Sequence, residues 1–187
     1  GHKRRMGDLG NPFFIDITEI DGFDDLHHAE GILKQAEERA AELYGSEETH
    51  YLVNGSTSGI LAAISGCTAA GGTVLLARNS HKSAYHAVLL RGLHVHYIYP
   101  QPAGKMGING PVTAENVDRL LEEHPETKMV YITSPTYDGV VSDVEQIAEV
   151  VHRRKLPLIV DEAHGAHFPF SEQFPKDSVS CGADVVI

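Results

Sequence analysis

The sequence predicts an α/β fold, a doubly wound and mostly parallel sheet with helices on both faces. Short apolar runs alternate with helical segments of about a dozen residues, which is typical of βαβ units. One run, residues 156–160, is apolar at four of its five positions and is followed directly by two carboxylates, Asp161 and Glu162. We therefore expect a strand buried on both faces, whose carboxyl end opens onto a site.

The first part of the chain has a different character. Residues 1–28 are polar and rich in Gly and Asp. Residues 29–44 have the apolar spacing of a helix, and Gly45 is suited to end it because glycine readily adopts the left-handed conformation. The apolar residues 51–53 are predicted to be a short strand before a helix that continues to Gly71. We therefore divide the chain into a lead segment, 1–28, and an α/β domain, 29–187.

The remaining elements follow in regular alternation. Strands are predicted over residues 73–77, 94–99, 128–133, 156–160 and 183–187. Helices are predicted over residues 81–90 and 114–123. A third helix is predicted from the capping box at residues 142–145 to about Arg154. Asn79 and Ser80 can cap the first of these helices, and Ser142 with Glu145 matches the capping box of the third.

Composition limits the classes of partner. Among the 187 residues, Asp and Glu outnumber Lys and Arg by 26 to 15, for a formal charge of -11. This acidic balance keeps a protein soluble, argues against nucleic acid as a partner and favours a cationic substrate. With no apolar stretch of about 20 residues and no signal peptide, we expect a cytoplasmic protein without a membrane partner. Cys67 and Cys181 suggest no disulfide framework.

The stretch from Asn54 to Gly59 precedes a predicted helix and contains three hydroxyl side chains, Ser56, Thr57 and Ser58. Backbone N–H groups at a helix N-terminus bind anions, so the stretch is a candidate phosphate site. An ordinary helix cap explains the same residues. The stretch matches neither the dinucleotide-binding motif nor the P-loop.

Two further candidates lie at the carboxyl ends of predicted strands. Asp161 needs a cation, a metal or a protonated ligand nitrogen, because an unpaired buried carboxylate is costly. His81 follows another strand, where a plain structural histidine is the alternative reading. With the phosphate site, these residues suit a flat, phosphorylated, nitrogen-containing aromatic cofactor.

Two other interpretations of the same stretch are not favoured. Asp161-Glu162-Ala163-His164 spells a helicase box, but a helicase needs a P-loop lysine. Asp161, His164 and His167 are spaced three residues apart, which would suit a metal site on a continuous helix. Gly165 and Pro169 disfavour such a helix. We predict no metal at this site.

The sequence resembles the large domain of the ornithine/lysine/arginine decarboxylases, which are pyridoxal-phosphate enzymes of the aspartate-aminotransferase fold. Six motifs occur in the order of that family and together span nearly the whole chain. They are Gly1-His2-Lys3, Asp24-Asp25-Leu26-His27, Asn54-Gly55-Ser56-Thr57-Ser58, Arg78-Asn79-Ser80-His81-Lys82-Ser83, Pro135-Thr136-Tyr137-Asp138-Gly139 and Val160-Asp161-Glu162-Ala163-His164-Gly165. The first two are left without a role.

The resemblance implies roles for the candidate residues toward pyridoxal 5'-phosphate. The residues Ser56, Thr57 and Ser58 would bind its phosphate. His81 would stack on one face of the pyridine ring, with Ala163 on the other. Asp161 would pair with the ring nitrogen so that the ring accepts electrons, and His164 would lie near the phenolic oxygen or the substrate carboxylate. His81, Asp161 and His164 are thus the predicted catalytic residues.

The sequence departs from the family pattern at its end. The Schiff-base lysine of the family follows a strand that resembles residues 183–187, and the sequence stops before it. We therefore expect a partial pyridoxal-phosphate domain, inactive alone, from a homodimeric or larger enzyme that converts arginine, lysine or ornithine to its amine and CO2. Another enzyme of the same fold, such as an aminotransferase, a lyase or a condensing enzyme, and a non-catalytic binding module are the alternatives.

Overall fold

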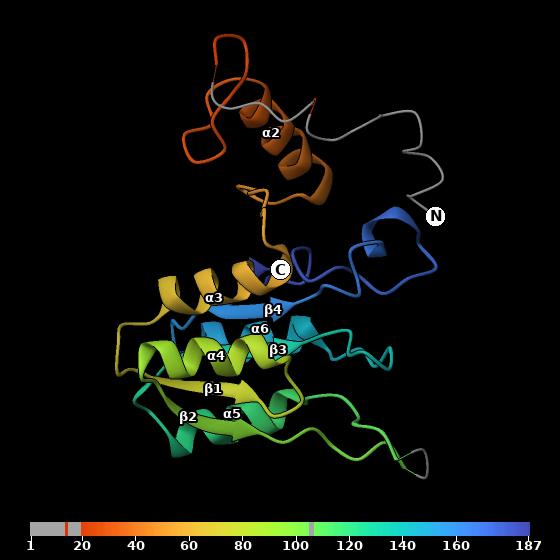
Figure 1. The fold of residues 1–187 in the computed structure, drawn as a ribbon. Coiled ribbons are helices and arrows are strands. Elements are labelled where there is room, and N and C mark those ends of the chain that lie inside the picture. Colours follow the sequence, from red (N-terminus) through yellow and green to blue (C-terminus); the bar gives the residue numbers. More distant parts are fainter. Residues whose placement is uncertain (1–13, 15–19, 105–106) are drawn as a thin grey trace. The chain divides into compact units, whose positions relative to one another are not determined.

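The computed structural model describes residue 14 and residues 20–104 and 107–187, and it divides into two compact units between Tyr51 and Leu52. Each unit is described by itself (Figure 1). The sequence analysis instead placed the start of the cofactor-binding domain at residue 29, and that boundary stays a prediction. The motif Gly1-His2-Lys3 lies outside the described residues. Within those residues, every helix is too short or too polar to cross a membrane.

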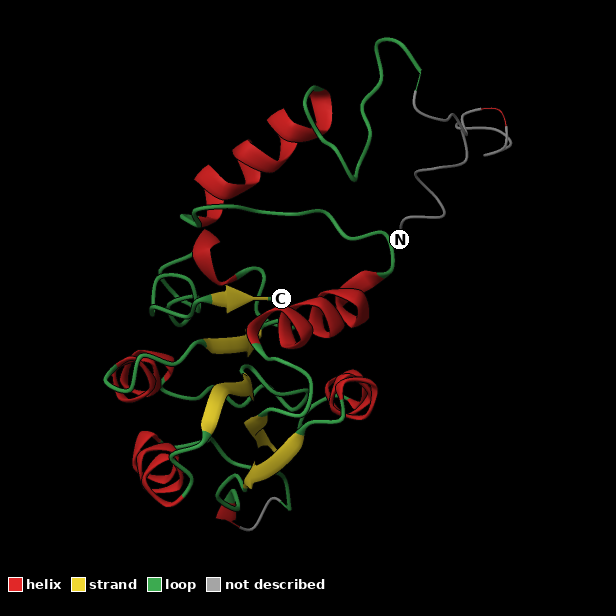
Figure 2. Ribbon diagram, turned by 90° about the vertical axis from the view of Figure 1, so that its left-hand side faces the viewer, coloured by secondary structure: helices red, strands yellow, loops and turns green. Residues whose placement is uncertain are grey.

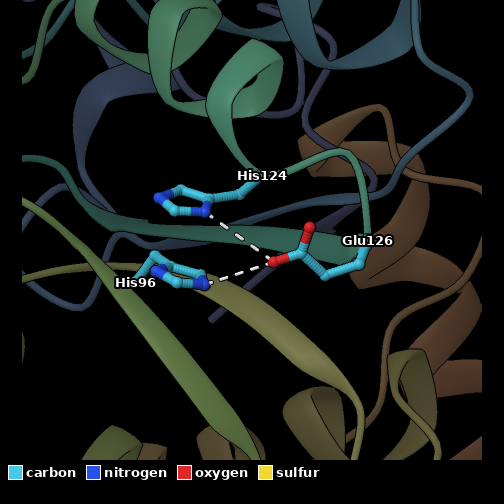
Figure 3. A group of neighbouring side chains, drawn as sticks. All are labelled: His96, His124 and Glu126. Atoms are coloured by element: carbon cyan, nitrogen blue, oxygen red, sulfur yellow. Dashed lines mark ion pairs between the residues drawn. The ribbon is translucent and has the colours of Figure 1, made fainter.

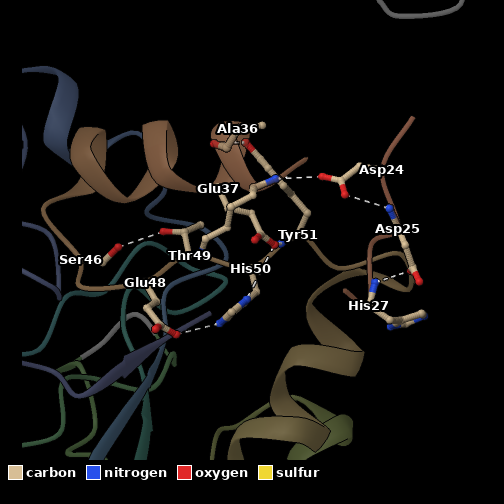
Figure 4. A network of polar contacts seen from close by, with 11 residues as sticks. Asp24, Asp25, His27, Ala36, Glu37, Ser46, Glu48, Thr49, His50 and Tyr51 are labelled. Carbon is tan, nitrogen blue, oxygen red and sulfur yellow. Dashed lines mark hydrogen bonds and ion pairs between the residues drawn. The ribbon is translucent and has the colours of Figure 1, made fainter. Parts of the chain in front are cut away.

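The first unit is built around helix α2 (Ile32–Tyr44), which ends at Gly45 in the left-handed conformation, as predicted. The Asp24 carboxylate caps its start, because it accepts the N–H groups of Glu30, Gly31 and Leu33 at 2.8–3.0 Å. These bonds, led by that from Glu30, hold the pKa of Asp24 at about 2. Figure 4 shows Asp24 beside Asp25 and His27. The second family motif therefore has a structural role here.

The second unit contains a sheet of five parallel strands in the order β2-β1-β3-β4-β5. The strands are β1 (Thr73–Ala77), β2 (His94–Ile98), β3 (Thr127–Thr133), β4 (Leu158–Asp161) and β5 (Val185–Val186). Every residue of β4 is buried, as the apolar run predicted. The predicted final strand is present but shortened to two residues.

Helices cover both faces of this sheet, which confirms the doubly wound prediction (Figure 2). One face packs against α3 (Gly55–Cys67) and α4 (Lys82–Arg91), and the other against α5 (Ala114–Glu123) and α6 (Val144–His152). Successive strand residues alternate between these two cores, so Tyr131 belongs to the α3/α4 side and Ile132 to the α5/α6 side. The short helix η4 (Phe168–Phe170) follows β4.

The predicted strand over residues 51–53 is wrong. All three residues are exposed and lie in irregular structure. A strand needs a neighbour for its backbone groups, whereas the Tyr51 N–H donates to the Glu37 carboxylate at 3.4 Å. The Tyr51 hydroxyl likewise donates to the Ala36 carbonyl (Figure 4). An apolar run of three residues therefore does not suffice without a strand to pair with.

Two predicted helix caps are displaced. Asp143, one residue after Ser142, caps α6 by accepting the Gln146 N–H at 3.0 Å. Ser142 instead bonds within the core, where its Oγ accepts the Val112 N–H. His81, not Asn79 or Ser80, caps α4. The expected helices were right, but tertiary contacts selected which polar side chain caps each one.

We predict that Asp143→Ala lowers the free energy of unfolding by about 1 kcal/mol, because the first turn of α6 loses its acceptor. Urea denaturation measures the change. Glu149→Ala, at an exposed position of the same helix, is the matched control and should be nearly neutral. Equal stabilities of the two variants would contradict the cap assignment.

Candidate active site

The candidate site lies at the carboxyl edge of the sheet, where the neighbouring parallel strands β1, β3 and β4 end together. α4 begins at this edge because it follows β1 directly. The first turns of α3 lie here too, since a Cβ on Gly59 would meet the Ile187 side chain at 3.2 Å, just after β5. The site is therefore assembled from strand ends and helix starts, as in other open α/β sheets.

Asp161 is the last residue of β4 and is only 5% exposed. It alternates with Ile159, which belongs to the α3/α4 core, so it faces those two helices. Tyr131, from β3, donates its hydroxyl to Asp161 Oδ2 at 3.1 Å. Asp161 Oδ1 accepts the Ala163 N–H at 3.3 Å. These two bonds fix the carboxylate at the end of its strand.

Tyr131 is fully buried, which suits a permanent hydrogen-bond donor. Burial, together with the neighbouring Asp161 charge, raises the pKa of Tyr131 far above its ordinary value. Its proton therefore stays in place, and the hydroxyl supports the carboxylate at any ordinary pH. The sequence analysis missed Tyr131; its position on the neighbouring strand, on the same face as Asp161, was the available signal.

Glu162 is adjacent in sequence but faces the opposite way. It accepts both the backbone N–H of Ser178, at 2.8 Å, and the Ser178 hydroxyl. The pKa of Glu162 is raised above its ordinary value, because the effect of burial outweighs that of the hydrogen bonds from Ser178. The two adjacent carboxylates therefore differ in role: Asp161 faces the candidate site, and Glu162 anchors the segment around Ser178.

The start of α3 is open. Its N-cap residue, Asn54, makes no side-chain capping bond, and Ser56 and Thr57 are exposed while Ser58 is half-buried. Ser58 donates its hydroxyl back to the Gly55 carbonyl at 2.9 Å. Because the N–H groups of a first helical turn have no partners within the helix, this uncapped turn offers donors to an anion.

His81 holds a fixed orientation at the start of α4. Its Nδ1 accepts the Ser83 N–H at 3.3 Å and lies 2.7 Å from the Ser83 hydroxyl. Close to it in sequence, the buried Oδ1 of Asn79 has no hydrogen-bond partner among the described residues. An orphaned acceptor at the carboxyl edge is the kind of group that a bound ligand satisfies.

The remaining predicted residues are exposed at the same edge. Ala163 and His164 lie two and three residues after Asp161, and the His164 ring meets the Tyr137 ring edge-on, with centroids 5.7 Å apart. The structure therefore brings the hydroxyl stretch of α3, His81 and the Asp161 segment to one edge of the sheet. Asp161 faces the side on which both helices pack.

Comparisons with known proteins agree with this geometry. A family model described as the Orn/Lys/Arg decarboxylase major domain matches residues 6–187. The chain belongs to the Orn/Lys/Arg decarboxylase family. The Bacillus subtilis protein YaaO is 43% identical over 92% of the chain and 36% of its own length. An arginine decarboxylase of Halalkalibacterium halodurans is 37% identical over 99% of the chain and 39% of its own length.

Solved structures agree on the fold. Lysine decarboxylase A from Pseudomonas aeruginosa matches with a TM-score of 0.76 and 24% identity, over 98% of this chain and 28% of that one. The fold is thus the α/β fold of pyridoxal-phosphate-dependent transferases, as predicted. The chain spans well under half the length of the two curated relatives named above.

We predict that Tyr131→Phe destabilises the protein by about 1.5–3 kcal/mol, because the buried carboxylate of Asp161 loses a donor. Thermal or urea denaturation measures the loss. Tyr99→Phe, at a position that is 64% exposed, controls for removal of a hydroxyl and should change little. A Tyr131→Phe variant as stable as the control would show that the hydrogen bond to Asp161 contributes nothing.

Proposed function

We propose that the full-length protein of this decarboxylase family uses pyridoxal 5'-phosphate to decarboxylate a basic amino acid. The observation that carries the proposal is Asp161, a buried carboxylate held by Tyr131 at the carboxyl edge of the sheet. It faces the side of the sheet that carries the uncapped start of α3. One negative group for a ring nitrogen and one set of donors for a phosphate are two of the requirements of this cofactor.

The residues present fit the cofactor at two ends. The open N–H groups and the hydroxyls of Ser56, Thr57 and Ser58 would hold its phosphate, since the helix dipole favours an anion there. Asp161 would accept a hydrogen bond from the pyridine nitrogen and keep that nitrogen protonated.

His81 and Ala163 would hold the ring from its two faces. The Ser83 contacts of His81 fix the imidazole and so favour stacking in one orientation. Ala163 follows Asp161 and carries a side chain small enough to lie flat against a ring. His164 would contact the phenolic oxygen or the substrate carboxylate, and its exposed position leaves it room to do so.

The chemistry requires a place for the electron pair that remains when the substrate loses CO2. Bound pyridoxal phosphate supplies that electron sink. Asp161 contributes by stabilising positive charge on the ring nitrogen, and the Tyr131 hydroxyl keeps its carboxylate in place. The formal charge of -11 favours a cationic substrate, and the curated relatives named arginine decarboxylase support arginine as the first to test.

The proposal extends to the assembly of the protein and its compartment. We expect a homodimer or a larger homo-oligomer in the cytoplasm, acting on a small-molecule substrate in polyamine formation. Leu89 and Leu90 of α4 support self-association, because they are 79% and 73% exposed and such apolar surface is commonly covered by a partner.

The function is tested on full-length protein loaded with pyridoxal phosphate, by CO2 release from arginine, lysine and ornithine. Asp161→Asn should retain the cofactor but lower decarboxylation at least about a hundredfold, roughly 2.7 kcal/mol of barrier. His167→Asn, outside the proposed contacts, is the control. Transamination without CO2 release would overturn the proposed reaction, and near wild-type turnover by Asp161→Asn would overturn the role of Asp161.

Residues 1–187 produced alone should be inactive, because the lysine that binds the cofactor covalently in the family is expected beyond Ile187. We predict that borohydride treatment with pyridoxal phosphate, followed by peptide mapping, gives only scattered substoichiometric adducts. Lys82, next to His81, is the position to watch. A single stoichiometric adduct at any lysine of the chain would contradict the prediction.

A further inference from the structure

Three potential metal ligands converge on the side of the sheet opposite the face of Asp161. They are His96 in the middle of β2, His124 at the end of α5, and Glu126 just before β3 (Figure 3). His96 alternates with Val95 and shares its face with Ile98, which belongs to the α5/α6 core. The three residues thus form a cluster separate from the candidate active site.

The spacing of the three ligand atoms suits a small cation. Glu126 Oε1 lies 3.3 Å from His96 Nε2 and 3.7 Å from His124 Nδ1, and all three atoms lie within 4.8 Å of one another. Ligands about 2.0–2.2 Å from a tetrahedral Zn²⁺ are roughly 3.4 Å apart. Two of the three separations therefore already match, while both exceed the usual length of a hydrogen bond.

The two histidine rings of the cluster lie against each other. The His96 and His124 rings are stacked, with centroids 3.4 Å apart and planes 10° from parallel (Figure 3). A nitrogen of each ring lies next to the same carboxylate oxygen of Glu126.

We propose that His96, His124 and Glu126 form a binding site for a divalent transition-metal ion, Zn²⁺ foremost. Two imidazoles and one carboxylate are a common ligand set for this ion, with water in the fourth position. A metal lies in the plane of the imidazole that binds it, so one ring must turn out of the stack. The His96 side chain is 35% exposed and the His124 side chain 26%, so His96 is the less confined of the two rings.

The bound ion would cross-link separate segments of the fold and so stabilise it. β2 is an edge strand, and β1 separates it from β3 in the sheet. The cluster would link β2 to the end of α5 and to the start of β3. A single ion would tie these three segments together. Because the site lies away from the carboxyl edge, its effect should be on stability, whatever reaction the protein catalyses.

The test uses untagged full-length protein, stripped with a chelator and titrated with ZnCl2 in a calorimeter. The expected result is one saturable site whose affinity falls at least about tenfold in His96→Gln. His94→Gln is the matched control, since His94 is exposed on the same strand and the same face but outside the cluster. Cobalt supplies a second readout, because a four-coordinate Co²⁺ site absorbs visible light.

Stability provides an independent measurement. Zn²⁺ at one hundred times its dissociation constant should raise the melting temperature of the full-length protein by about 2–4 °C, in the wild type and His94→Gln but not in His96→Gln. Glu126→Gln serves as a second cluster variant if His96→Gln does not fold. Equal affinity in the wild type and both cluster variants, or unsaturable binding only, would overturn the site.

Discussion

The hydrogen bond from Tyr131 to Asp161 is the interaction on which the candidate site depends. A carboxylate that is 5% exposed must find partners, because its desolvation is costly. Tyr131 supplies one from the neighbouring strand β3 at 3.1 Å, and the Ala163 N–H supplies another. Register between β3 and β4 therefore fixes where the charge lies, and a slip of one residue would turn it to the other face.

Successive residues of a strand face opposite sides of the sheet, so adjacent side chains reach different surroundings. Asp161 faces α3 and α4, where the open helix start lies, whereas Glu162 turns away and binds Ser178. On the edge strand β2 the same alternation places His96 on the α5/α6 side. The alternation of faces therefore keeps the candidate active site, the contact of Glu162 with Ser178 and the proposed metal site apart.

The starts of three helices differ in a way that is useful for function. α4 is capped by His81 and α6 by Asp143, so their first turns have a partner within the chain. The N-cap residue of α3, Asn54, makes no side-chain capping bond, and the N–H groups of a first helical turn have no partners within the helix. Of these three helices, α3 is the one whose N-cap residue makes no side-chain bond, and it is also the one at which the sequence indicated a phosphate.

The sequence by itself determined the order of strands and helices, because hydrophobic periodicity is local: the strand 73–77 and the helix 114–123 were predicted with their observed bounds. It also placed Asp161 at a carboxyl end. Only the tertiary structure decided the rest. Residues 51–53 had no strand to pair with, and Ser142 was taken by the core. His96, His124 and Glu126 lie on three separate segments, so their meeting depends on packing, which no local pattern encodes.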